Sequence, residues 1–169
     1  MNKFLIVVSL LFCTPVLLIG QQQLKAKEIS FVFESKEVQG SIGDFRSEST
    51  ISTDDISQSV FEGSVSTSSL KTGNFLRDWA LKSRKYFNED QYPRIHFKST
   101  AVSGNTQEIQ VEGLLTLKGK TKPLTIYFKR RNGQLVGTAE LYTSDYGVQI
   151  KKIRAENKVH IRFAFVLEE

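Results

Sequence analysis

The chain has 169 residues, a length that suits one domain with a hydrophobic core of its own. It carries 23 Lys and Arg residues against 18 Asp and Glu residues. This mildly basic balance could favour an anionic ligand or a membrane surface, but it is weak evidence for nucleic acid, so we predict no nucleic-acid partner.

The first twenty residues have the pattern of a secretory signal peptide. Lys3 supplies a positive start, residues 4–19 are almost wholly apolar, and the chain turns polar after Gly20. The alternative is an uncleaved anchor, but this run is shorter than the ~20 residues that a spanning helix needs, and Thr14 and Pro15 interrupt it. We therefore predict cleavage after Gly20, with a signal peptide at 1–20 and a single domain at 21–169.

The only cysteine, Cys13, lies inside this predicted signal. A lipoprotein signal would need small residues before the cysteine, whereas Leu11 and Phe12 stand there. The exported part would then have no disulfide, no thiolate metal site and no cysteine nucleophile. Such a chain fits the bacterial periplasm, which is the predicted location.

From Glu28 onward, apolar and polar residues alternate, as they do in strands with one buried face. Turn signals such as Gly104-Asn105 and Asn132-Gly133 separate the alternating runs. The pattern predicts an all-β fold of about eight antiparallel strands, arranged as a meandering barrel or a sandwich. The apolar positions of the alternating runs include Ile29, Phe31, Phe33, Val38, Ile42, Phe61, Val65, Ile95, Phe97, Ile109, Val111, Leu115, Leu117, Leu124, Ile126, Phe128, Leu135, Val159, Ile161, Phe163, Phe165 and Leu167.

One segment between two strands has a helical period instead. Residues 72–74 offer a capping residue, and Phe75, Leu76 and Trp79 then fall on one helical face. We predict a short helix of about three turns that ends in residues 88–91 and lies across a barrel mouth or flank. Its Phe75, Leu76 and Trp79 face is expected to be buried against something apolar.

Arg77 and Asp78 are the best candidates for a polar site. Adjacent residues on a helix point about 100° apart, so the two side chains do not form a facing pair. Arg77 could reach a carboxylate of the barrel or the anionic head of a lipid, and Asp78 suits the start of a helix. Both a structural role and a head-group role are open at this point, and the structural one is more common for such pairs.

Catalytic and metal sites have little support in the sequence. His96 and His160 are the only histidines, and each lies in a strand pattern where a surface position explains it. The chain has no Gly-x-Ser-x-Gly nucleophile elbow. We therefore predict no metal, no cofactor and no enzymatic activity.

Basic residues cluster at several turns. They lie at Lys118, Lys120 and Lys122, at Arg130 and Arg131, and at Lys151, Lys152 and Arg154. They could be solvated charge that protects strand edges, or a docking patch for an anionic membrane or a pyrophosphate head. Small inward residues, namely Gly63, Ser99, Ala101 and Gly113, are expected to leave room beside the phenylalanine rings of a partly hollow interior.

Three segments together resemble the YceI-like family of bacterial exported proteins. They are SLKTGNFLRDWALKSRKYFNEDQYPRIHFKS at 69–99, VQGSIGDFRSESTIS at 38–52 and VEGLLTLKGKTKPLTI at 111–126. The resemblance extends over nearly all of the chain after about Ile29. Two departures concern histidines that are frequent in the family, because Ala80 stands at one of those places and residues 34–36 at the other.

This resemblance implies a lipocalin-like antiparallel eight-stranded barrel with a helix beside its opening and an internal tunnel. It implies that the tunnel holds a long-chain lipid, either a polyisoprenoid or a fatty-acid derivative, and that some members are homodimers. Contact with a membrane surface and a solid-core interaction module without lipid are the further possibilities. The candidate lipid contacts are Phe31, Phe33, Ile42, Phe61, Val65, Phe75, Trp79, Ile95, Phe97, Leu115, Leu117, Ile126, Phe128, Phe163 and Phe165, and the head-group candidates are Arg77 and Asp78.

Overall fold

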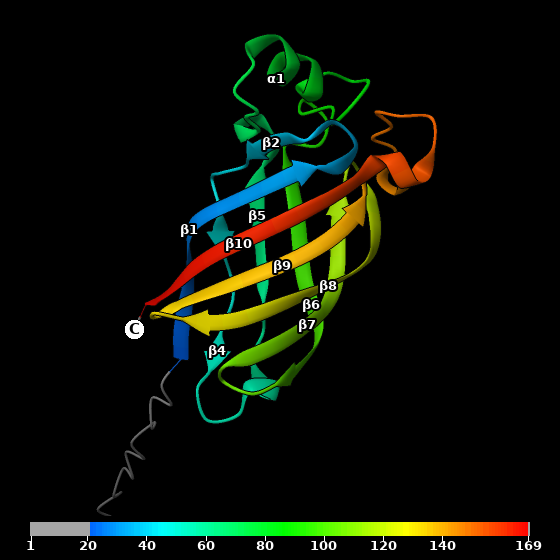
Figure 1. The fold of residues 1–169 in the computed structure, drawn as a ribbon. Coiled ribbons are helices and arrows are strands. Elements are labelled where there is room, and N and C mark those ends of the chain that lie inside the picture. The colour runs from blue at the N-terminus through cyan, green and yellow to red at the C-terminus, as the bar shows by residue number, and fades with distance from the viewer. Residues whose placement is uncertain (1–20, 169) are drawn as a thin grey trace, which may run out of the picture.

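The computed structural model describes residues 21–168, which form one curled antiparallel sheet with a single α-helix at one end (Figure 1). The predicted signal peptide at 1–20 lies outside the described residues. Within this range, no helix has the length and hydropathy that crossing a membrane would require. The predicted all-β barrel with one inserted helix is confirmed.

Ten strands make up the sheet of the described residues, and eight of them span four residues or more. Their bounds are β1 Gln21–Phe33, β2 Val38–Ser41, β3 Arg46–Ser47, β4 Ile51–Ser52, β5 Glu62–Ser66, β6 Arg94–Gly104, β7 Glu108–Leu117, β8 Lys120–Arg131, β9 Gln134–Tyr142 and β10 Lys158–Glu168. The helix α1 spans Phe75–Lys82, and short 3₁₀ turns lie at η1 Glu34–Lys36, η2 Ile56–Gln58, η3 Thr67–Ser69, η4 Thr143–Tyr146 and η5 Arg154–Asn157.

The strands follow the order β2-β1-β10-β9-β8-β7-β6-β5-β3, and every pair is antiparallel. The first residues of β1 also pair with β4, which follows β3 in the chain, so the ends of the sheet come together and the barrel closes. Tight turns at Lys118-Gly119 and Asn132-Gly133 join β7 to β8 and β8 to β9. All four residues have positive φ angles, as the favoured two-residue hairpin turns require, and this confirms the turn signal at Asn132-Gly133.

The two ends of the barrel differ. One end, called the mouth end here, carries η1, the segment 67–93 with α1, the β7–β8 turn and the segment 143–158 (Figure 1). The opposite end carries η2 and the β6–β7 and β8–β9 turns. We call this opposite end the closed end. It is filled by apolar side chains that are 8% exposed or less, namely Ile51, Ile56, Ile109, Val111 and Leu135. The hydrophobic core is therefore densest at the closed end.

The helix α1 differs from the prediction in its length and in its packing. Asn74 caps it by accepting a hydrogen bond from the Arg77 backbone N–H. It ends after eight residues, where the Ser83 hydroxyl bonds to the Ala80 carbonyl and the backbone becomes extended. The predicted three turns were therefore too long, because a local side-chain bond ends the helix before the apolar period does.

The expectation that the apolar face of α1 is buried is wrong. Phe75, Leu76 and Trp79 are 80%, 73% and 70% exposed. The opposite side of the helix, with Ala80 and Leu81, faces the barrel interior instead. Phe75 and Trp79 therefore do not contribute to the interior to which the sequence analysis assigned them.

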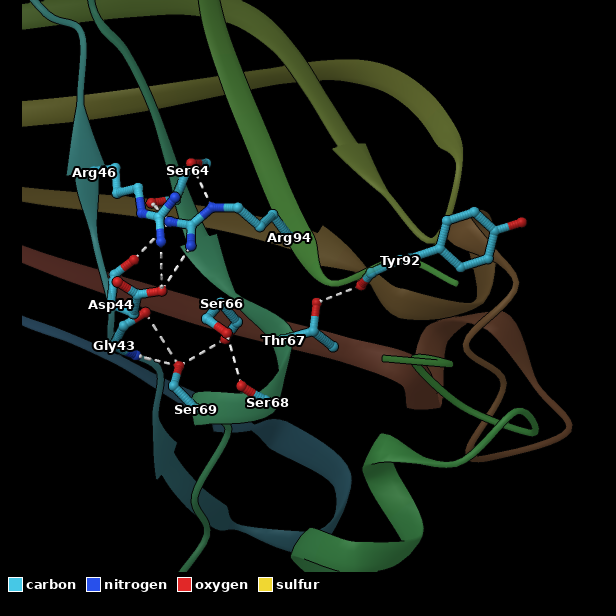
Figure 2. A network of polar contacts seen from close by, with 10 residues as sticks. All are labelled: Gly43, Asp44, Arg46, Ser64, Ser66, Thr67, Ser68, Ser69, Tyr92 and Arg94. Atoms are coloured by element: carbon cyan, nitrogen blue, oxygen red, sulfur yellow. Dashed lines mark hydrogen bonds and ion pairs between the residues drawn. The ribbon is translucent and has the colours of Figure 1, made fainter. Parts of the chain in front are cut away.

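A polar network fastens the connection between β2 and β3 to the neighbouring strands (Figure 2). The guanidinium of Arg94, 15% exposed, donates to the Ser64 hydroxyl at 2.8 Å and to the Ser64 carbonyl at 3.0 Å. It also donates to the Asp44 carboxylate and to the Asp44 carbonyl, both at 2.6 Å. One side chain on β6 thus holds both β5 and the loop that leads into β3.

Replacing Arg94 with Gln is expected to lower the free energy of unfolding by about 2 kcal/mol at neutral pH, because Ser64 and Asp44 lose a shared donor. The hydrogen bond from Arg94, assisted by the charge of Arg46, lowers the pKa of the Asp44 carboxyl. A lowered folded-state pKa gives stability that is present above the unfolded pKa of about 3.9 and is lost as pH falls through the folded pKa. Thermal unfolding against pH should therefore show the difference between wild type and variant narrowing below about pH 4.

Asp44→Asn is the matched control, since it removes the titrating group and keeps an amide oxygen for Arg94. Its unfolding temperature should fall below that of wild type above about pH 4 and converge with it in acid. A gap between Arg94→Gln and wild type that is constant with pH would contradict the role given to the Arg94–Asp44 contact.

Candidate functional site

The candidate site is a cavity of about 370 Å³ inside the barrel, on the side of the mouth end. Strands on all sides contribute inward apolar side chains, and α1 contributes Ala80 and Leu81. Thirteen of the fifteen residues predicted to face the interior line it, and Phe75 and Trp79 do not. The thirteen are Phe31, Phe33, Ile42, Phe61, Val65, Ile95, Phe97, Leu115, Leu117, Ile126, Phe128, Phe163 and Phe165.

Other lining residues were missed by the sequence analysis as site residues. Leu124, Val159 and Ile161 belong to the same alternating runs, so the period-2 pattern could have placed them at the cavity. Tyr86, Phe87 and Ile150 come from irregular segments at the mouth end. No sequence period points to such residues, because only tertiary packing turns them inward.

Five phenylalanines form the floor of the cavity above the packed closed end. Their ring centroids lie 5.0 to 6.1 Å apart in a connected cluster, within the range favoured for aromatic pairs. The cluster consists of Phe45, Phe61, Phe128, Phe163 and Phe165. Because Phe61, Phe128 and Phe165 are 4% exposed or less, the floor is closely packed.

Inward-facing glycines allow several rings to lie against the barrel wall. A Cβ atom built on Gly137 would be 2.3 Å from Cε1 of Phe128, and one on Gly113 would be 2.5 Å from Cζ of Phe97. Gly40 lies similarly close to a phenylalanine ring. Gly113 was expected to leave room beside a ring, whereas the ring of Phe97 itself occupies the space of the absent side chain. The centre of the barrel stays open as a consequence.

Gly137→Ala should therefore reduce both stability and cavity size. The three atoms nearest to the new methyl group would all belong to the ring of Phe128, which is 2% exposed and stacked on Phe61 at 5.4 Å. Forcing that ring inward should cost about 1–3 kcal/mol, measurable by urea unfolding. Gly133→Ala has open space around its Cβ but a positive φ, so it reports backbone strain without a ring displacement. A smaller xenon- or lipid-accessible volume in Gly137→Ala alone is the expected difference.

The polar groups at the cavity rim are few. Arg77 lines the cavity and donates from Nε to the Thr72 hydroxyl at 2.7 Å and from Nη2 to the Thr72 carbonyl at 2.9 Å. Asp78 accepts the Thr72 backbone N–H at 2.8 Å and also bonds to the Thr72 hydroxyl. Arg77 and Asp78 thus both hold Thr72 in place. Among the described residues no partner is found for Nη1 of Arg77, which leaves a donor at the rim.

His160 lies outside the cavity, whereas His96, which is exposed on β6, is among the residues that line it. His160 is on the outer wall between Glu34 and Glu140, at 2.7 and 2.8 Å, and Lys158 lies 2.9 Å from Glu140. The Lys158 hydrogen bond is the main reason why the pKa of Glu140 is lowered. Over residues 21–168, no group of three acidic, histidine or cysteine side chains is arranged to hold a metal ion.

Comparison with known proteins gives the family. A sequence profile of the YceI-like domain matches residues 21–167. The chain belongs to the YceI-like family. It is 32% identical over 98 residues to Protein YceI of Shigella flexneri, across 58% of this chain and 47% of that protein. It is 33% identical over 98 residues to the UPF0312 protein plu2095 of Photorhabdus laumondii, across 58% and 48%. This YceI-like chain thus matches about half the length of these relatives.

Two solved structures share the fold of this YceI-like chain. BcnA of Burkholderia cenocepacia superposes with a TM-score of 0.73 at 18% identity, across 84% of this chain and 96% of BcnA. A polyisoprenoid binding domain from Saccharophagus degradans, implicated in plant cell wall breakdown, superposes with a TM-score of 0.57 at 13% identity, across 87% and 97%. At these identities, the likeness shows a common barrel fold.

Proposed function

We propose that this protein is an exported binding protein without catalytic activity that holds a long apolar lipid inside the barrel. The observation that carries the proposal is the cavity of about 370 Å³, whose lining is apolar except for a few groups that include Arg77 at the rim. Ligand cavities of proteins typically have this size and this mostly apolar lining. Family membership and the polyisoprenoid binding domain with the same fold support a polyisoprenoid or a fatty-acid derivative as the ligand.

The physical basis of binding would be burial of the lipid chain, at ~0.8 kcal/mol for each CH₂ group taken out of water. The thirteen cavity-lining residues predicted from the sequence are the proposed lipid contacts. Arg77, with its unpartnered Nη1, is the proposed donor to a polar or anionic head. Asp78 would act through Thr72, which it shares with Arg77.

Export to the periplasm is part of the proposal and rests on the pattern of residues 1–20. Transport, storage and stress protection are the roles proposed for a barrel that takes up and releases lipid. A homodimer and peripheral contact with a membrane also belong to the proposal, the membrane contact at the end of the barrel where the cavity opens.

Native mass spectrometry of the exported protein tests this function. The expected result is a mass increment that disappears on denaturation, with the released molecule identified as a polyprenyl or fatty-acyl lipid by chromatography. The delipidated protein should take up the same lipid again from solution. A protein that repeatedly elutes empty, and that does not bind added polyprenyl or fatty-acyl ligands, would show the proposal to be wrong.

The competing function is an interaction module with a solid core, which binds a partner at its surface. It requires a filled barrel, and the open space of about 370 Å³ speaks against it. Under that alternative, the delipidated protein would bind no lipid, and substitutions that fill the cavity would change nothing.

A further inference from the structure

Two groups of exposed apolar side chains lie at the mouth end, and each group is called an apolar tip here. On α1, Phe75, Leu76 and Trp79 are 70% exposed or more, and Ile153 in the segment 143–158 is 62% exposed. These are four of the eight large apolar side chains that are exposed in the described residues, and the other four are spread over the strands and the β4–β5 connection. The tips are therefore concentrated at one end of the barrel, where Figure 1 shows α1 and the segment 143–158 projecting beyond the strands.

Basic side chains surround both tips. The segments of the mouth end (34–37, 67–93, 118–122 and 143–158) hold thirteen basic and seven acidic residues, whereas the rest of the chain from 21 onward holds nine basic and eleven acidic ones. Lys82, Arg84, Lys151 and Lys152 have no acidic partner within 4.0 Å among the described residues. The positive charge of the chain is thus gathered at the mouth end.

These basic segments form one surface although they are far apart in sequence. Lys118 in the β7–β8 turn donates to the Lys85 carbonyl and to the Gly147 carbonyl, both at 3.2 Å. It therefore joins the segment that follows α1 to the segment that carries Ile153. The same helix α1 presents Ala80 and Leu81 to the cavity and Trp79 to solvent, so the exposed tip and the cavity rim lie on two sides of one short element.

Apolar tips inside a positive surface match the interface of an anionic membrane. Aromatic residues prefer the headgroup region, where their apolar bodies leave water, and nearby lysine and arginine side chains are attracted to anionic lipid. A second copy of the chain fits this surface less well, because two copies joined by it would bring two net-positive faces together.

We propose that the mouth end docks on an anionic lipid membrane, with Phe75, Leu76, Trp79 and Ile153 entering the headgroup region and the cavity opening toward the lipid. The proposal deepens the proposed function, on which its purpose rests, by naming the surface from which lipid is taken up or to which it is released. Docking itself does not require an occupied cavity.

Trp79 is the only tryptophan of the chain, so its fluorescence reports the docking directly. We expect its emission to shift to shorter wavelength on addition of vesicles of phosphatidylcholine mixed with phosphatidylglycerol. Vesicles of phosphatidylcholine alone should give no shift at the same ionic strength, and added salt should reduce the shift. An unchanged Trp79 spectrum with protein that cosediments with the vesicles would overturn the proposal, as would the absence of cosedimentation.

Two matched pairs of variants locate the surface. Leu76→Ser with Trp79→Ser should weaken vesicle cosedimentation by about tenfold or more, whereas Leu114→Ser with Tyr127→Ser removes a leucine and an aromatic from the barrel wall and should not. Lys151→Gln with Lys152→Gln should weaken it as well, whereas Lys27→Gln with Arg131→Gln removes two exposed charges elsewhere and should not. Equal effects within either pair would overturn the proposal.

A last measurement separates docking from lipid binding. The delipidated Leu76→Ser, Trp79→Ser variant should take up a fatty-acyl ligand delivered from cyclodextrin as wild type does, because neither residue lines the cavity. If the delipidated wild-type protein also fails to take up the ligand, the proposed function is wrong, whereas the docking result still stands. A wild-type dimer that this variant converts to a monomer would overturn the membrane proposal in favour of a second copy.

Discussion

Val65→Trp is expected to weaken lipid binding by about a hundredfold or more. Val65 projects from β5 into the cavity and is only partly buried by its neighbours, so an indole ring there would occupy space in which a lipid chain lies. Excluding about four CH₂ groups, at ~0.8 kcal/mol each, costs roughly 3 kcal/mol of binding free energy. Titration of the delipidated protein with a fluorescent fatty-acyl or polyprenyl ligand measures the loss.

The matched control is Tyr127→Trp, which places the same side chain on the outer wall, where Tyr127 is 55% exposed. It should bind lipid as wild type does. Far-UV circular dichroism and urea unfolding should show that both variants retain the fold, since each ring enters space that is already open. A Val65→Trp protein with unchanged lipid affinity would place the ligand outside the barrel.

The second large effect is expected from Asn157→Ala, with a loss of about 3 kcal/mol in the free energy of unfolding. Asn157 is fully buried under the segment 147–156. Its Oδ1 accepts the N–H groups of Ile150 and Lys151, both at 2.9 Å, and its Nδ2 donates to the carbonyls of Lys151 and Ile153 at 2.9 and 2.8 Å. Alanine would remove the side-chain partner of all four backbone groups, of which the Ile153 carbonyl alone keeps another among the described residues, the Glu156 N–H.

Urea unfolding gives the magnitude of this loss, and hydrogen exchange should show the fastest increase in residues 147–157. Because Ile150 lines the cavity, ligand affinity should fall as well.

Asn105→Ala is the matched control. Asn105 also organises a turn, by accepting the N–H groups of Gln107 and Glu108, but it lies on the surface at the closed end. Its loss should cost less than about 1 kcal/mol, and an equal cost for both variants would contradict the role given to burial.

The alternating pattern predicted the strands because one face of each must be buried, which is a local property of the sequence. It placed residues such as Phe97 and Leu117 correctly toward the interior for the same reason. It could not give the closure of the barrel, which depends on the two-residue strands β3 and β4, too short to show any period.

The helical pattern showed that α1 has an apolar face but not what that face would contact. The apolar face of a helix is usually buried. In this structure the apolar face of α1 points to solvent, while Arg77 and Asp78 on the same helix bond to Thr72. The cavity was equally hard to derive, because a ring such as that of Phe128 can fill a core or lie flat on a glycine. That choice depends on the residue across the sheet, many positions away in sequence.

The packed closed end has a consequence for the kinds of molecule that the barrel can accept. Because Ile56, Ile109 and Leu135 are packed at the closed end, a lipid bound as proposed would enter and leave through the mouth. An amphiphile would then enter with its apolar end first and leave with its polar end first. The distance from the phenylalanine floor to the rim sets an upper limit on the chain length that can be fully sheltered. Longer homologues of the same lipid would share their head-group position and differ only in how much chain stays outside.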